Sequence, residues 1–234
     1  MKILVSLLIF LFAPQMIWAN NQLWQYSKSD STKIVALLDE AKNEKEDTNF
    51  PLYFANKFIG IRYVASTLER NKTEKLVINL QELDCTTLVE NVLALTLCVK
   101  TKQYSFNQFC TFLQKIRYNN GVISYPTRLH YFSEWINDNT KQGFVKEINT
   151  PNPPFKSQQI LDLHYMSTQH HKYPMLVQNP SWIKEIRRME QMVSGKTVNY
   201  IPKGILNNSS LIKDFIKDGD IIAIVTARKG LDTS

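Results

Sequence analysis

Cys85 lies at a point where the sequence pattern changes from strand to helix. Leu76, Ile78 and Leu80 alternate with other residues, which predicts a short strand with one buried face. Apolar residues recur at helical spacing after Asp84, and Asp84 is a favourable N-cap residue. Cys85 would then lie in the first helical turn, where unpaired N–H groups and the helix dipole stabilise a thiolate nucleophile. The alternative is a small buried residue that merely occurs at a helix start.

The other two cysteines, Cys98 and Cys110, fall on apolar helical faces. Cys98 ends the apolar face of the helix that Cys85 begins, and Cys110 shares helical spacing with Phe109 and Leu113. We therefore expect both to be core residues. A disulfide between Cys98 and Cys110 is an alternative that nothing in the sequence requires, and the odd number of cysteines leaves at least one free thiol.

Histidines are few, and their spacing does not predict a metal site. No arrangement of Cys and His resembles a structural zinc site, and the pair His170-His171 stands alone. The sequence therefore predicts no metal and no cofactor. His130 lies in an aromatic-dense stretch, residues 125–136, which we expect to open a helix after Pro126. A single histidine in such a stretch is either a structural core residue or a catalytic one.

The first 19 residues predict a secretory signal. Lys2 gives a positive start, residues 3–13 form a short apolar core, and residues 17–19 are a plausible cleavage site. The apolar core is too short to span a membrane, although an N-terminal anchor helix is the alternative interpretation. We expect a single exported domain at residues 20–234, in the periplasm or cell envelope, with no membrane span after cleavage.

The chain is basic, with a formal net charge of +7 that falls to +6 when Lys2 leaves with the signal. An excess of positive charge suits an anionic partner such as a cell wall or a membrane surface, and ordinary solubility is the alternative explanation. Nucleic acid is a poor candidate, because the Lys and Arg residues are scattered, export removes the chain from DNA, and no nucleic-acid-binding motif is present.

The remaining pattern predicts an α+β protein with helical decoration. A first helix, capped by Asp30 or Ser31, should bury Ile34, Val35, Leu38 and Ala41. Further helices are expected at residues 54–59, 105–117, 161–166 and 180–193, and strands at 61–65, 143–148, 198–201 and 221–226. The strand at 221–226 is so apolar that we expect it in the centre of a sheet. The proline-rich segment 150–155 should be a linker or a surface loop.

Four stretches together resemble the N-acetylmuramoyl-L-alanine amidase-like family of exported bacterial proteins, which belongs with the papain-like cell-wall peptidases of the NlpC type. They are residues 60–69, 79–91, 128–136 and 219–225, and the similarity extends over nearly all of the mature chain. The resemblance implies a papain-like core in which the nucleophile begins a helix packed on an antiparallel sheet. Cys85 would be that nucleophile.

In such enzymes the general base is a His at the start of a later strand, which follows a strand that begins with Gly-Asp. Here Gly219-Asp220 and the predicted strand 221–226 are followed by only eight residues, none of them His. The resemblance therefore implies that the catalytic His and the last strands lie beyond Ser234 and that this chain is C-terminally truncated. The alternative is that His130 supplies the base.

The resemblance also implies the rest of the site and its activity. Tyr63 would lie beside the nucleophile, and Arg128, His130 and Tyr131, with Asp84, would line the substrate groove. The Cys85 thiolate would attack an amide of a peptidoglycan stem peptide or a muropeptide and form a thioester that water hydrolyses. The alternative is a non-catalytic cell-wall-binding protein that keeps the groove but lacks the base.

Overall fold

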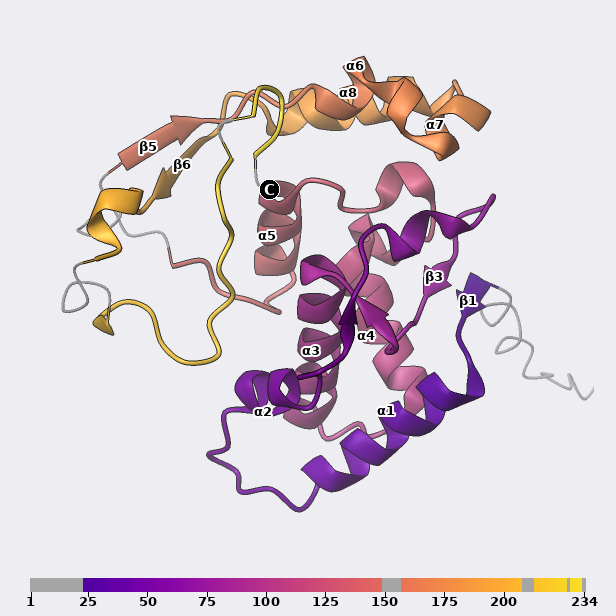
Figure 1. The fold of residues 1–234 in the computed structure, drawn as a ribbon, viewed down its shortest axis with the longest axis vertical. Helices are drawn as coiled ribbons and strands as arrows, with labels where there is room; N and C mark the ends of the chain where they lie inside the picture. The colour runs from indigo at the N-terminus through magenta and orange to yellow at the C-terminus, as the bar shows by residue number, and fades with distance from the viewer. Residues whose placement is uncertain (1–22, 149–156, 208–212, 227, 233–234) are drawn as a thin grey trace, which may run out of the picture.

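The computed structural model describes residues 23–148, 157–207, 213–226 and 228–232. The predicted signal peptide and the proline-rich segment 150–155 lie outside these ranges. The described residues form a mixed α+β structure, rich in helices and with very short strands (Figure 1). The α+β prediction is therefore confirmed. The α-helices are α1 Lys28–Ala41, α2 Phe50–Asn56, α3 Cys85–Lys100, α4 Phe106–Arg117, α5 Phe132–Lys141, α6 Tyr165–Thr168, α7 Pro174–Gln178 and α8 Trp182–Val193.

The strands form two-residue or four-residue pairs, and short 3-10 helices connect several elements. The strands are β1 Trp24–Gln25, β2 Arg62–Tyr63, β3 Leu76–Val77, β4 Glu82–Leu83, β5 Ser157–Ile160 and β6 Thr197–Tyr200. The 3-10 helices are η2 Thr67–Arg70, η3 Asn119–Gly121, η4 Tyr125–Thr127, η5 His170–Lys172 and η6 Lys203–Ile205. β1 pairs with β3 and β2 with β4, both in parallel, and β5 pairs with β6 in antiparallel fashion.

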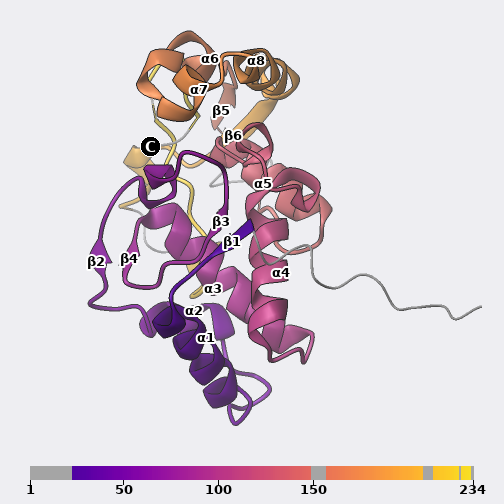
Figure 2. The same cartoon turned by 90° about the vertical axis from the view of Figure 1, so that its right-hand side faces the viewer.

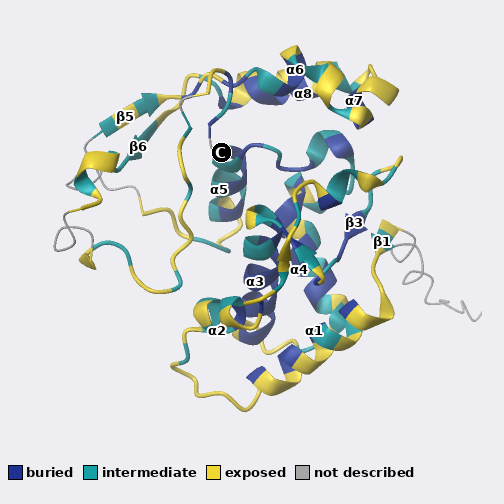
Figure 3. Cartoon of the chain, in the orientation of Figure 1, coloured by how far each residue is buried: buried dark blue, intermediate teal, exposed yellow. Residues whose placement is uncertain are grey.

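The larger of two hydrophobic clusters surrounds α3. This helix is apolar on nearly every side, and its buried positions run from Thr87 to Val99. α1, α2 and α4 pack around it, each with one apolar face toward α3 and one polar face toward solvent (Figure 3). A helix that is hydrophobic all round belongs in the centre of a core, which explains why α3 occupies that place.

The second hydrophobic cluster lies at the opposite end of the molecule from α1 and α2. There α6, α7 and α8 gather above α5, as Figures 1 and 2 both show. Tyr125 and Tyr131, from the segment before α5, pack against Leu163, Ile186 and other side chains of this cluster. The aromatic stretch 125–136 thus joins the two clusters, because its later residue Trp135 packs in the larger one.

The start of α4 follows the predicted cap, whereas the start of α1 does not. The Ser105 side chain accepts a hydrogen bond from the backbone N–H of Gln108 and begins α4, as expected. The first helix begins earlier than predicted: Ser27 is the N-cap, and Asp30 stands three residues later as its capping-box partner. Val35 was expected to be buried but is exposed, and Leu37 is buried in its place.

Three predictions of secondary structure are wrong. Residues 143–148 and 221–226 form no strand, and of their residues only Val225 lies in a β-bridge. The apolar side chains at 221–225 are consequently exposed rather than central, Ile222 by 66% and Ile224 by 64%. The helix expected at 161–166 begins only at Tyr165, since Leu161 still bonds to the carbonyl of Lys196 beside β6.

The short antiparallel pair β5–β6 lies apart from α3 in Figure 1. Next to the start of α3, the strands that the structure describes are the parallel pair β2 and β4. The papain-like core that the resemblance implies therefore stays a prediction. Within the described ranges, no helix is both long enough and apolar enough to cross a membrane.

Candidate active site

Cys85 is the first residue of α3, and its side chain is exposed. A reciprocal cap fixes this helix start. The Asp84 carboxylate accepts hydrogen bonds from the backbone N–H and the hydroxyl of Thr87, at 2.8 and 2.7 Å, and the Thr87 hydroxyl accepts one from the Asp84 N–H at 2.9 Å. The helix start and the Asp84 cap are therefore as predicted. Asp84, proposed from the resemblance as a groove residue, is engaged in holding the helix end.

The cap leaves donors free at the cysteine. Thr87 gives its N–H to Asp84, and Leu88 begins the regular helical bonds by donating to the Asp84 carbonyl. The N–H groups of Cys85 and Thr86 have no acceptor among the described residues. Unpaired N–H groups at a helix start favour negative charge beside them.

Tyr63 reaches the cysteine from a neighbouring strand. β2 and β4 pair in parallel, with Tyr63 opposite Leu83, two residues before Cys85. Negative charge on the Cys85 sulfur, as the thiolate, is the largest cause that raises the pKa of Tyr63, followed by partial desolvation and by the Asp84 carboxylate. Tyr63, Asp84 and Cys85 therefore form one group, and Tyr63 is exposed.

Cys98 and Cys110 differ from Cys85 in burial, which governs the reactivity of a thiol. Both are fully buried in the larger cluster and both are free thiols, so the alternative of a disulfide between them is excluded. Burial raises the pKa of Cys98 to about 12 and raises that of Cys110 as well. A buried neutral thiol is not a nucleophile, which leaves Cys85 as the reactive candidate.

Arg128 belongs to a second, buried group. Its guanidinium forms an ion pair with Glu69, lies 3.6 Å from Glu74, and stacks 4.8 Å above the Tyr125 ring. Burial alone would lower the pKa of Arg128, but the Glu74 and Glu69 carboxylates outweigh burial and raise the pKa above its usual value. Arg128 is therefore a charged residue of the interior, and a substrate could reach it only by displacing one of these partners.

His130 is held beside Arg128 as a neutral ring. Its Nε2 lies 2.7 Å from the carbonyl oxygen of Tyr125, which can only accept, so Nε2 carries the proton. Burial and the nearby Arg128 charge lower the pKa of His130 to about 3. An effective general base has a pKa near the working pH, so this environment makes His130 a weak one.

Tyr131 is buried in the second cluster. Its hydroxyl donates to a carboxylate oxygen of Glu190 at 2.7 Å and accepts from the Met166 N–H at 3.1 Å. The same Glu190 oxygen accepts from the Ser167 N–H at 3.0 Å. Burial raises the pKa of Tyr131, so the group stays a hydrogen-bond donor.

Glu90 connects the two groups of predicted residues. It lies buried on α3 and pairs with Arg117 of α4 at 2.7 Å. Burial raises the pKa of Glu90, Arg117 opposes this, and both Asp84 and Arg128 act on it at longer range. The two groups therefore lie around the first turns of α3, although no hydrogen bond between Cys85 and a histidine occurs in the described part of the chain.

Sequence reasoning missed the carboxylates of this region, namely Glu69, Glu74, Glu90 and Glu190. Glu69 ends one of the stretches that carry the resemblance, and that position was a usable signal. Glu190 gave none, because its partners Tyr131 and Ser167 are distant in sequence.

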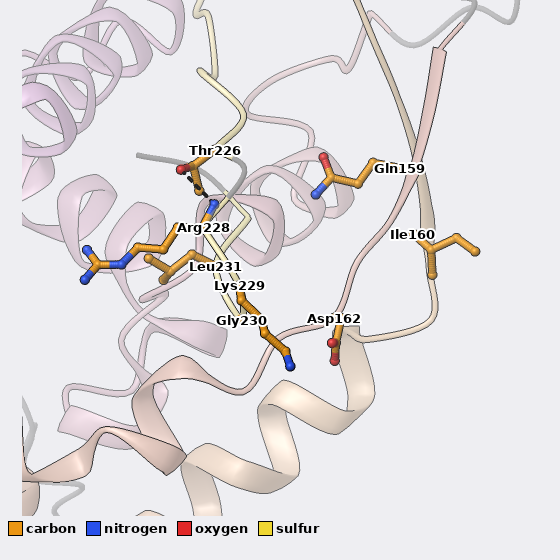
Figure 4. A pocket seen from close by; sticks show the side chains of 8 residues that line it. All are labelled: Gln159, Ile160, Asp162, Thr226, Arg228, Lys229, Gly230 and Leu231. Carbon is orange, nitrogen blue, oxygen red and sulfur yellow. Dashed lines mark hydrogen bonds between the residues drawn. The ribbon is translucent and has the colours of Figure 1, made fainter.

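A hollow elsewhere contains none of the predicted site residues. It has a volume of about 140 Å³ and lies between the end of β5 and the C-terminal loop (Figure 4). Its lining is mainly polar and includes Gln159, Asp162, Arg228 and Lys229. The hollow is remote from α3 in sequence and in structure, and therefore plays no part in chemistry at Cys85. Among the described residues, no group of three His, Cys, Asp or Glu side chains could hold a metal ion.

Comparison with known families gives a match over most of the chain. The profile of the N-acetylmuramoyl-L-alanine amidase-like (AmiA-like) family matches residues 53–234. This chain belongs to that family. The matched range contains β2, the start of α3 and the segment before α5, so it includes every predicted site residue.

Solved structures of similar proteins agree with the family. An N-acetylmuramoyl-L-alanine amidase from Bacteroides uniformis is 41% identical, with a TM-score of 0.72 over 79% of this chain and 76% of that one. A Bacteroides fragilis protein described as a candidate xylanase is also 41% identical, with a TM-score of 0.69 over 78% of each chain. A Legionella pneumophila protein of the DUF1460 family shares the fold at 19% identity, with a TM-score of 0.57 over 88% of this chain and 78% of that one. Curated proteins gave no match.

Proposed function

We propose that this member of the amidase-like family is an exported, thiol-dependent hydrolase that cuts an amide bond in peptidoglycan stem peptides, with Cys85 as the nucleophile. The observation that carries the proposal is the exposed Cys85 at a capped helix start, with the Tyr63 hydroxyl beside its sulfur. Family membership supplies the substrate class, and its cell-wall chemistry suits a protein of the envelope.

The chemistry would proceed by acyl transfer. The Cys85 thiolate attacks the amide carbonyl carbon, and the oxygen gains negative charge as the tetrahedral intermediate forms. The free N–H groups of Cys85 and Thr86 are the available donors for that oxygen. The C–N bond then breaks as the leaving nitrogen takes a proton from solvent, and water hydrolyses the thioester to a carboxylate, a proton and the free thiol.

Tyr63 is the group best able to assist at the sulfur. Its hydroxyl stays protonated, because the negative charge of the Cys85 thiolate and then partial desolvation raise its pKa. A neutral hydroxyl there can donate a hydrogen bond to the sulfur or to the developing oxyanion. We propose that Tyr63 positions these atoms, while Arg128, His130 and Tyr131 lie behind the surface of the substrate groove and support its wall.

A second candidate function is cell-wall binding without turnover. It is favoured by two observations: within the described ranges, no histidine forms a hydrogen bond with Cys85, and the low pKa of His130 makes that residue a weak base. A Cys–His enzyme loses several orders of magnitude in rate when the base is absent. The papain-like, NlpC-type core, the signal at residues 1–19 and a single domain from residue 20 onward are part of the same proposal.

The test is incubation of purified peptidoglycan with the protein, followed by chemical assay of the new ends. Amide hydrolysis releases amino groups, and glycoside hydrolysis, which a xylanase-like activity would perform, releases reducing ends. We expect new amino groups only, with loss of the activity in Cys85→Ala and after iodoacetamide treatment. Near-ultraviolet circular dichroism of Cys85→Ala checks the fold. Reducing ends, or full activity in Cys85→Ala, would refute the proposal, and binding without any new ends would favour the second candidate.

A further inference from the structure

α8 has two faces of opposite character. Ile186, Met189 and Val193 are buried in the second hydrophobic cluster, and the other side of the helix is open to solvent. The exposed side carries Lys184, Arg187 and Arg188. We call these three residues the α8 cationic face. Figures 1 and 2 both place α8 at an outer edge of the molecule.

The charge of the α8 cationic face is not neutralised by its surroundings. None of its three side chains forms an ion pair with another described residue. Glu185 is the one carboxylate that stands with them on the outer side. The other acid of the helix, Glu190, is turned inward, where its carboxylate accepts from Tyr131 and Ser167. Three cations against one carboxylate leave two net positive charges.

The three cations are arranged as neighbours rather than scattered. Positions 184, 187 and 188 lie three and four residues apart and therefore on adjacent turns of one helix face. Together with Glu185 and Gln191 their side chains border an open hollow of about 440 Å³. Elsewhere some basic side chains form ion pairs with carboxylates, as Lys57 does with Glu40 and Arg70 with Glu82.

We propose that the α8 cationic face is a second binding surface, separate from Cys85, for the carboxylates of an anionic envelope glycopeptide. The identification of peptidoglycan as that polymer rests on the proposed function. Stem peptides carry free carboxylates at a regular spacing along a polymer, so several of them can meet several cations at once. Adjacent weak contacts of this kind add through a high effective concentration, and salt screens them.

Such a surface would keep the protein on the insoluble wall between turnovers. A single exposed ion pair contributes little, but a cluster that meets a polyanion gains from steering and from repeated rebinding. The buried half of α8 supplies rigidity, because it is anchored by the second cluster and by the Glu190 hydrogen bonds. Substitution of the charged residues on the outer side should therefore leave the fold intact.

The experiment compares two triple variants in a Cys85→Ala background, which prevents turnover. Lys184→Gln, Arg187→Gln and Arg188→Gln remove the α8 cationic face, and Lys45→Gln, Lys102→Gln and Lys141→Gln remove the same charge from scattered exposed sites. Binding is measured by co-sedimentation with purified peptidoglycan and by fluorescence titration with poly-L-glutamate, at several salt concentrations. Peptidoglycan whose carboxylates have been amidated, and vesicles of an anionic phospholipid, are the comparison ligands.

We expect the α8 triple variant to bind peptidoglycan and poly-L-glutamate about tenfold more weakly at low salt, with a shallower salt dependence, and the scattered variant to bind nearly as the parent does. Amidation should weaken the parent to a similar degree. Equal binding by the two triple variants, or undiminished binding of amidated peptidoglycan, would overturn the proposal, as would preference for the vesicles. Since Cys85 is already absent, these outcomes do not depend on whether the protein hydrolyses the wall.

Discussion

The three cysteines lie in different environments. Cys85 lies exposed at the start of α3, whereas Cys98 and Cys110 are buried with raised thiol pKa values. Alkylation requires an accessible thiolate, so a brief exposure of the native protein to iodoacetamide should modify Cys85 alone. Mass spectrometry of tryptic peptides measures this. The unfolded chain, as the control, should be modified at all three positions, and native labelling of Cys98 or Cys110 ahead of Cys85 would contradict the assignment.

Glu134 on α5 predicts a pH dependence of stability. Its side chain is buried, one carboxylate oxygen has no hydrogen-bond partner among the described residues, and burial followed by the Asp138 charge raises its pKa to about 7. Lys196 opposes this shift and Asp232 adds to it. Because the folded state retains a proton that the unfolded state loses near pH 4.5, the free energy of unfolding should fall as pH rises from about 4.5 to 7.

Replacement by the uncharged isostere tests this expectation. Glu134→Gln should match the parent near pH 4.5 and be more stable at pH 8, by at most on the order of 3 kcal/mol. Urea titrations at several pH values measure the difference, and Glu185→Gln, which removes an exposed carboxylate on α8, should show no such trend. An equal difference at all pH values would mean that packing rather than ionisation distinguishes Glu134 from Gln.

At the scale of elements, helix caps link stability to the site. Asp84 caps α3 beside Cys85, and Ser105 caps α4 away from it. Loss of such a cap typically costs about 1 kcal/mol, so Asp84→Ala and Ser105→Ala should lower the free energy of unfolding by similar amounts. Only Asp84→Ala should also change the rate at which iodoacetamide modifies Cys85. If Ser105→Ala altered that rate equally, the effect would be global rather than local to the capped turn.

The same elements show what the sequence could and could not predict. The starts of α3 and α4 were predictable because capping involves residues three apart, Asp84 with Thr87 and Ser105 with Gln108. The stretch 221–226 had strand composition, but a strand exists only where a partner completes its ladder, and composition does not provide one. The buried role of Glu190 was likewise invisible, because it depends on Tyr131, 59 residues away.

At the scale of the whole molecule, the C-terminal stretch joins distant parts. Gly219 lies against Asn49, the residue before α2, and the Asn49 side-chain amide donates to the Asp218 carbonyl at 2.6 Å. Asp232 accepts a hydrogen bond from the Ser133 N–H at the start of α5. Between these two anchors the chain crosses the surface, visible as the yellow trace in Figure 1. The anchors hold the stretch in place, but they leave the apolar side chains between them in water.

Those side chains predict self-association. Ile222 and Ile224 are exposed, and residues 221–224 lie in no described strand or bridge, so their backbone N–H and C=O groups can pair with those of another copy. We expect light scattering to rise when the protein is warmed gently below its unfolding temperature. Ile222→Lys with Ile224→Lys should suppress the rise without lowering the melting temperature, because neither side chain belongs to a core. Ile59→Lys with Val122→Lys, at two exposed apolar residues outside the segment, adds the same charge, is the matched control and should leave the association intact. Suppression by this control to the same extent would show that added charge alone, and not the segment 221–225, governs association.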